Sequence, residues 1–151
     1  MTTLKEQLRD DLTAAIKARD ELVSSTLRLT LTAVTAQEVA GTEKRELSDD
    51  EVLQVIGREA KKRREAATAF DTAGRTESAA QERAEGEVLA RYLPKQLDDA
   101  ELAAIVAAAV AESGASGPQA MGAVMKLVKP KTEGLAEGGR VAAAVKAALL
   151  G

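Results

Sequence analysis

The chain has 151 residues, with 21 basic and 24 acidic side chains, a formal net charge of −3, and no His or Cys. The missing residue types exclude Ser-His-Asp and Cys-His nucleophile systems, Cys and His zinc sites, and disulfides. The length suits about one domain, but 31 residues are Ala and the only aromatic residues are Phe70 and Tyr92. We therefore expect a thin core of helices packed on helices, and the near-balanced charge does not by itself point to a polyanionic partner.

The first part of the chain shows helix signals and almost no strand signals. A capping box opens a first helix at Thr3, and a second helix is expected over about 20–40. The apolar residues of the second helix form two stripes, Val23-Leu27-Leu31-Val34 and Leu22-Leu29-Ala33-Ala36. Two stripes predict a central helix that packs on two sides.

The next two predicted helices lead to a domain boundary. Another capping box opens a helix of about 25 residues at Ser48. Thr76 is expected to cap a fourth helix, which ends before Pro94 because proline disfavours helical geometry at the preceding residue. We place the boundary there, between an N-terminal helical domain of residues 1–93 and a C-terminal helical domain of residues 94–151.

Three further helices are predicted in the C-terminal domain. The first starts at a capping box at Asp98 and stops at Gly114, the second runs from Pro118 to Pro130, and the last covers about 139–150. Together the elements predict an all-α protein with an N-terminal four-helix portion and a smaller C-terminal three-helix domain. The charged N-terminus and the lack of an apolar stretch of about 20 residues predict a soluble, cytoplasmic protein with no membrane partner.

A basic tetrad, Lys61-Lys62-Arg63-Arg64, lies in the third predicted helix and reads as a nucleic-acid patch. On a helix, at about 100° per residue, its four charges spread around the axis, and Arg63 falls on the apolar side with Glu59. These two residues are four apart with the acid first, which is the orientation that favours an ion pair. We interpret this pair as structural, and a partner contact by the tetrad is the alternative.

The segment 118–146 has a clear charge asymmetry. Its five cations and two acids, Glu133 and Glu137, give a net charge of +3, so the rest of the chain totals −6. The cations are Lys126, Lys129, Lys131, Arg140 and Lys146. They are the candidate RNA-binding residues because Lys and Arg contacts to phosphates supply most nonspecific affinity; ordinary solvated helix faces are the alternative. With two aromatic residues in the chain, base stacking cannot dominate, so an RNA target is expected to be shaped or double-helical.

The outward face of the helix after Asp98 is apolar where charge would be expected. It consists of Ala104, Ala107, Ala108 and Ala111. Helix propensity alone explains surface alanines, and a protein-interaction face is the alternative. The acidic cluster Asp49-Asp50-Glu51 is explained by capping of a helix start rather than by a metal. No constellation of an active site is present in the sequence, and we expect no enzyme activity, no metal and no cofactor.

Several short motifs follow one another along nearly the whole chain. They are Thr26-Leu27-Arg28-Leu29, Leu47 to Ile56 with Lys61-Lys62-Arg63, Tyr92 to Leu97, Gly114-Ala115-Ser116, Met121 to Lys126, Pro130-Lys131 and Gly134 to Gly138. As a set they resemble the GatB/YqeY family. Its C-terminal helical domain is shared with the B subunit of the glutamyl-tRNA(Gln)/aspartyl-tRNA(Asn) amidotransferase, where it is associated with holding tRNA. The resemblance implies a tRNA-handling module without an active site, because the chemistry resides in parts of that enzyme that this chain does not contain.

One motif departs from the family pattern. It usually reads Gly-Arg-Ala-Asp-Gly and here reads Gly134-Leu135-Ala136-Glu137-Gly138, so the loop lacks a cation. We expect Glu137 to cap the last helix. The family resemblance implies a non-catalytic tRNA-binding accessory module, which we do not expect to bind DNA. The alternative is a protein-protein interaction adaptor without nucleic-acid binding.

Overall fold

The computed structural model describes residues 2–150, which form seven α-helices, one 3-10 turn and no β-strand. The all-α prediction is confirmed. Contacts within the chain divide it into two units, residues 1–93 and 94–151, which is compatible with the boundary expected before Pro94. Among the described residues, no single helix is long and apolar enough to cross a membrane. One pair of helices, Asp99–Ser113 with Pro118–Thr132, would reach that length together, across a bend of 96°.

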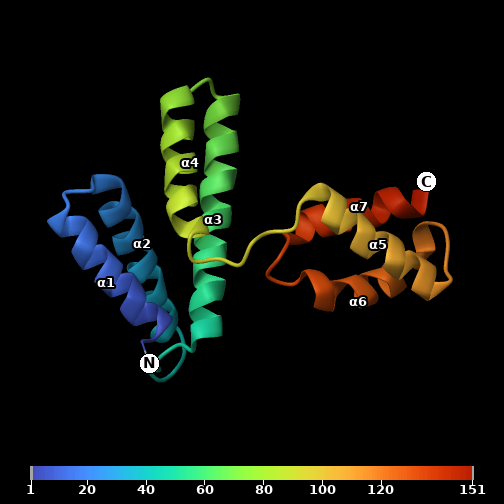
Figure 1. Cartoon of the computed structure of the whole chain (residues 1–151), viewed down its shortest axis with the longest axis horizontal. Helices are drawn as coiled ribbons and strands as arrows, with labels where there is room; N and C mark the ends of the chain where they lie inside the picture. The colour runs from blue at the N-terminus through green and yellow to red at the C-terminus, as the bar shows by residue number, and fades with distance from the viewer. Residues whose placement is uncertain (1, 151) are drawn as a thin grey trace. The chain divides into compact units, whose positions relative to one another are not determined.

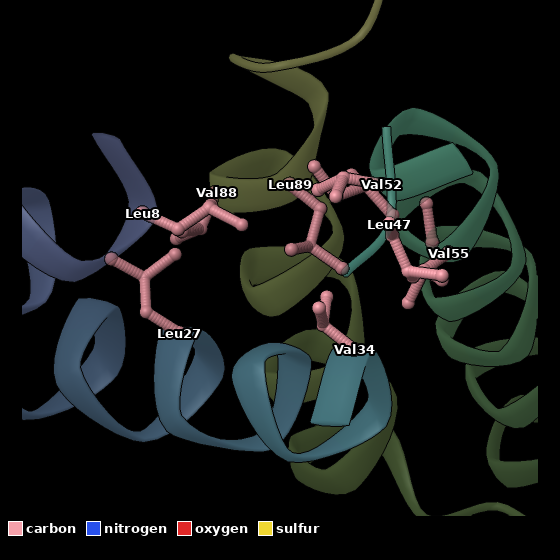
Figure 2. Close-up of a cluster of buried hydrophobic side chains, with 10 residues drawn as sticks. Leu8, Leu27, Val34, Leu47, Val52, Val55, Val88 and Leu89 are labelled. Atoms are coloured by element: carbon pink, nitrogen blue, oxygen red, sulfur yellow. The ribbon is translucent and has the colours of Figure 1, made fainter. Parts of the chain in front are cut away.

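The first unit contains α1 (Leu4–Lys17), α2 (Glu21–Glu38), α3 (Asp49–Thr72) and α4 (Thr76–Ala90) (Figure 1). α1 packs on α2, and α3 and α4 form a long hairpin. Core side chains come from all four helices and the segment before α3 (Figure 2); they are Leu8, Leu27, Val34, Leu47, Val52, Val55, Ile56, Ala60, Val88 and Leu89. Each fully buried Leu or Val among them contributes about 1.5–3 kcal/mol.

Three helices begin at the capping boxes that the sequence predicts. In each box the N-cap side chain accepts from an amide three residues on, and that residue's carboxylate accepts from the N-cap amide; the pairs are Thr3 with Glu6, Ser48 with Glu51, and Asp98 with Glu101. The cap predicted for the fourth helix is wrong. Gly74 turns the chain tightly after α3, so Thr76 is already helical and the N-cap is Arg75, which makes no side-chain capping bond.

α2 buries one of its two predicted stripes more fully than the other. The stripe Val23-Leu27-Leu31-Val34 faces the core, whereas Leu29 of the second stripe is 51 % exposed and Ala36 is exposed. Thr26 and Thr30 are buried instead, and their hydroxyls donate to backbone carbonyls four residues earlier at 2.7 and 2.8 Å. A hydroxyl satisfied within its own helix can be buried without a polar partner on another helix, which a hydropathy pattern does not register.

Tyr92 belongs to the first unit and ties the end of α4 to α1. Its ring packs against the core, and its hydroxyl donates to Oδ2 of Asp11 at 2.5 Å. Burial and the adjacent Asp11 carboxylate raise the pKa of the Tyr92 hydroxyl. The last residues before the second unit are therefore held by a specific polar contact.

The second unit contains α5 (Asp99–Ser113), the 3-10 turn η1 (Pro118–Ala120), α6 (Met121–Thr132) and α7 (Gly138–Leu150). Its three α-helices pack on one another around a separate core, made of Leu102, Val106, Ala109, Val124, Val128, Val141 and Val145. The prediction that Pro130 ends the helix is wrong, because α6 continues to Thr132. Since Pro130 lies in the last turn, only one amide hydrogen bond is lost close to the helix end.

Candidate nucleic-acid interface

The charged side chains of the second unit are sorted by helix. α5 carries three acids and no cation, and the acids are Asp99, Glu101 and Glu112. α6 and α7 carry five cations and no acid, and the cations are Lys126, Lys129, Lys131, Arg140 and Lys146. The six basic and six acidic residues of 94–151 cancel as a sum. The surface of α6 and α7 is nevertheless locally positive, because the acids lie on α5 and in loops.

Lys126 and Lys129 occupy the outward face of α6. Val124 and Val128 of the same helix are fully buried in the core, while both lysines are exposed. Residues three apart on a helix place their Cβ atoms about 5–6 Å from each other. Within residues 2–150 the side chain of neither lysine makes a hydrogen bond or an ion pair. Two neighbouring ammonium groups are therefore available to an anionic ligand.

The other three candidate cations differ in their surroundings. Lys131 and Lys146 are exposed and likewise make no ion pair within the described chain. Arg140 is half-buried, and its Nη2 donates to Oδ1 of Asp99 at 2.9 Å, which joins the start of α7 to the start of α5. Arg140 thus has a structural contact that the sequence pattern did not indicate, because Asp99 lies 41 residues away.

The basic tetrad of α3 is divided between the interior and the surface of the first unit. Arg63 and Glu59 are each 7 % exposed, and Nη1 of Arg63 lies 3.4 Å from Oε1 of Glu59, which confirms the predicted pair. Arg63 also reaches α4, where its Nε lies 3.8 Å from Oε2 of Glu85. The other three members of the tetrad are exposed.

A comparison with known families covers both units. A family model described as Yqey-like protein matches residues 5–149. The chain belongs to the YqeY-like protein family. The family resemblance carried by the sequence motifs is thereby confirmed, and the similarity to the amidotransferase tail stays a prediction. A search of curated proteins finds no match.

In this YqeY-like chain, the loop that departs from the family pattern is held by backbone contacts. Gly134 has a φ of 77°, a left-handed conformation that favours glycine. The amide of Leu97 donates to the carbonyl of Leu135 at 2.8 Å, and Nε2 of Gln96 donates to the carbonyl of Gly134 at 3.1 Å. The carbonyl of Glu137 accepts a hydrogen bond from the amide of Val141 at 3.1 Å, which places Glu137 at the start of α7.

The alanine face of α5 is exposed, as its pattern predicts. All four members lie at the surface: Ala104, Ala107, Ala108 and Ala111. The helix has no charged residue between Glu101 and Glu112. An exposed alanine surface fits both high helix propensity and protein contact.

The acidic start of α3 acts in helix capping and helix packing. Ser48 and Glu51 form the capping box, and Oδ1 of Asp49 accepts a hydrogen bond from the amide of Leu4 at 3.0 Å. Within residues 2–150, no group of three or more His, Cys, Asp or Glu side chains is arranged to hold a metal ion.

Proposed function

We propose that this YqeY-like protein is a non-catalytic accessory module that binds tRNA through the α6 and α7 surface of its second unit. The observation that carries the proposal is the exposed pair Lys126 and Lys129 on α6, a helix without an acid. Their side chains form no ion pair with any part of the chain that the structure describes. The choice of tRNA comes from the motif resemblance to the amidotransferase tail.

The expected contact is with the phosphate backbone. Residues 94–151 contain no aromatic side chain, so the second unit has no platform on which an unpaired base could stack. Lysines on a helix surface neutralise phosphates and release the counterions bound there. On a duplex, the logarithm of the binding constant then falls with the logarithm of the salt concentration, with a slope of about 0.9 per phosphate contact. Binding of this kind depends on RNA shape and charge and is similar for different tRNAs.

The five cations should not contribute equally. Lys126 and Lys129 are exposed neighbours on a helix that carries no acid, so they should contribute most to the affinity for tRNA. Arg140 already donates to Asp99, and a phosphate would have to compete with that carboxylate. We expect Arg140 to contribute least.

The test compares tRNA binding of two variants that lose the same charge. Lys126→Gln with Lys129→Gln removes the α6 pair, and Lys17→Gln with Lys95→Gln removes two exposed lysines elsewhere. We expect the α6 variant to bind total tRNA at least tenfold more weakly at about 0.1 M salt, with a salt slope shallower by about 1 to 2. The control variant should bind like the wild type, and duplex DNA should bind less well than tRNA.

Three results would contradict the proposal. They are no binding of wild-type protein to tRNA at low salt, affinity that does not change with salt, and equal weakening by the control variant. The adaptor function would then lead, since the α5 alanine face is exposed and uncharged.

The adaptor function has its own test on the α5 alanine face. Ala107→Glu with Ala111→Glu should abolish capture of a protein partner if that face is a docking surface. Ala143→Glu with Ala147→Glu places the same charges on exposed positions of α7 and serves as the control. Recovery of the same partners by both variants would exclude the α5 face as the interface.

A further inference from the structure

The α3–α4 hairpin of the first unit is polarised in charge. Residues 58–64 of α3 carry five cations and one acid, Glu59, whereas α4 carries four acids and one cation, Arg83. α5 of the second unit is likewise acidic and α6 basic. The first unit thus also presents one helix with a locally positive segment.

The fold decides which of these cations reach the surface. Arg63 is withdrawn into the hairpin, where it contacts Glu59 and Glu85. Arg58, Lys61 and Lys62 are exposed. At about 100° per residue they fall within an arc of about 100°, and Arg63 points about 140° away from Arg58. We call these three exposed cations the α3 basic face.

The lysines of the α3 basic face lie beside acids and still remain exposed. Nζ of Lys62 lies 3.0 Å from Oε2 of Glu59, and Nζ of Lys61 lies 3.9 Å from Oε1 of Glu65. The lysine side chains remain 71 % and 50 % exposed. The Lys61–Glu65 pair is exposed on both sides and contributes little. Glu59 is buried, but it keeps its contact with Nη1 of Arg63 at 3.4 Å if Lys62 turns to a phosphate.

We infer that the α3 basic face is a second phosphate-contacting surface, which binds the backbone of the same RNA as the second unit. The inference rests on the proposed function for the identity of the polyanion. Arg58 and Lys62 lie one helical turn apart, about 6 Å along the axis, so the face suits a short run of backbone phosphates. Two cationic surfaces on linked units raise affinity, because binding by one unit increases the effective concentration of RNA at the other.

The test uses the full chain and total tRNA. Arg58→Gln with Lys61→Gln and Lys62→Gln removes the α3 basic face. Its control, Arg9→Gln with Lys17→Gln and Arg28→Gln, removes three exposed cations from α1 and α2. We expect the α3 variant to bind at least tenfold more weakly at about 0.1 M salt, with a salt slope shallower by about 2 to 3, and the control to bind like the wild type.

Circular dichroism checks that both triple variants are as helical as the wild type. The tRNA-binding results of the variants then separate this inference from the proposed function. If the α3 variant binds normally while Lys126→Gln with Lys129→Gln weakens binding, the α3 surface is not a contact and the proposed function stands. If wild-type protein does not bind tRNA at low salt, both fail. Equal weakening by the α3 variant and its control would also overturn the inference.

The α3 basic face could instead contact the acidic α4 of a second copy. Sedimentation velocity without RNA tests this alternative. A wild-type dimer that the α3 variant converts to a monomer, with tRNA affinity unchanged, would make the face a self-contact and overturn the inference. A monomer in both cases, together with weakened tRNA binding, supports it.

Discussion

Replacing Lys5 with Met should destabilise the first unit, because Lys5 neutralises a buried carboxylate. Glu38 at the end of α2 is 2 % exposed, and its two oxygens accept from Nζ of Lys5 at 2.8 and 2.9 Å. The amide of Leu47 donates to the same carboxylate at 3.4 Å. Glu38 therefore joins α1, α2 and the segment that leads into α3, and Lys5→Met leaves it with one long amide contact.

The expected loss follows from this burial. Removing one partner of a buried ion pair costs about 3–5 kcal/mol. The Lys5 side chain is still 17 % exposed, so water can reach the site and we expect the lower end, about 3 kcal/mol in the free energy of unfolding. Lys17→Met on the same helix removes an exposed lysine and should change stability by less than about 0.5 kcal/mol.

The effect should also depend on pH. The hydrogen bonds from Lys5 lower the pKa of Glu38 from its ordinary value of 4.5. A carboxyl whose pKa is lowered by folding contributes stability above its unfolded pKa, and this contribution disappears as pH falls through the folded value. In Lys5→Met the buried carboxylate has lost its cation, so burial should raise the pKa of Glu38 instead. The difference between wild type and Lys5→Met should therefore be largest near pH 7 and shrink steadily as the pH falls towards 4.

Urea unfolding followed by circular dichroism at pH 7 and pH 4 measures both effects. A double variant, Lys5→Met with Glu38→Gln, should be less destabilised than the sum of the single variants, because the two residues contact each other. Additive losses in the two single variants would refute the reasoning. So would a loss of less than about 1 kcal/mol in the free energy of unfolding for Lys5→Met at pH 7, or a loss at pH 4 as large as the loss at pH 7.

Two further predictions concern single positions in the first unit. A left-handed residue follows each of α1 and α3, Arg19 at φ 58° and Gly74 at φ 77°. Arg19→Gly should therefore stabilise by about 0.5–1 kcal/mol, and Gly74→Ala should destabilise by about 1 kcal/mol. Urea unfolding in which both variants shift the same way would contradict this. Burial and the neighbouring Glu85 raise the pKa of Glu82, so its ionised form opposes folding at neutral pH. Glu82→Gln should stabilise at pH 7, and this gain should vanish below about pH 4.5; a variant less stable than wild type at pH 7 would show otherwise.

Features within one helix could be predicted from the sequence. The capping boxes at Thr3, Ser48 and Asp98 were found because their partners lie three residues away, where helical geometry determines contact. The exposed alanine face of α5, with Ala104 and Ala108, could be predicted because positions on one face repeat with the helical period. The pair Glu59 and Arg63 could be predicted for the same reason, because the two residues lie four apart on one helix.

Contacts between helices could not be predicted in this way. Lys5 with Glu38, Arg63 with Glu85, and Arg140 with Asp99 all join different helices. The sequence shows which residues are charged but not which helix faces meet. The burial of Thr30 was missed for a related reason, since its hydroxyl is satisfied by its own backbone and the residue behaves as an apolar one.

The sequence by itself therefore determined the all-helical class, most helix starts and the absence of His- and Cys-based chemistry, because these depend on residue type and on spacings shorter than one or two turns. Tertiary structure decided which charges are held by other residues of the chain and which stay exposed. Arg63 and Arg140 are held by acids on other helices, while the side chains of Lys126 and Lys129 stay exposed and make no ion pair within the described residues 2–150. The physical reason is that desolvation and ion pairing of a side chain depend on its neighbours in space, and for these arginines the neighbours lie on other helices.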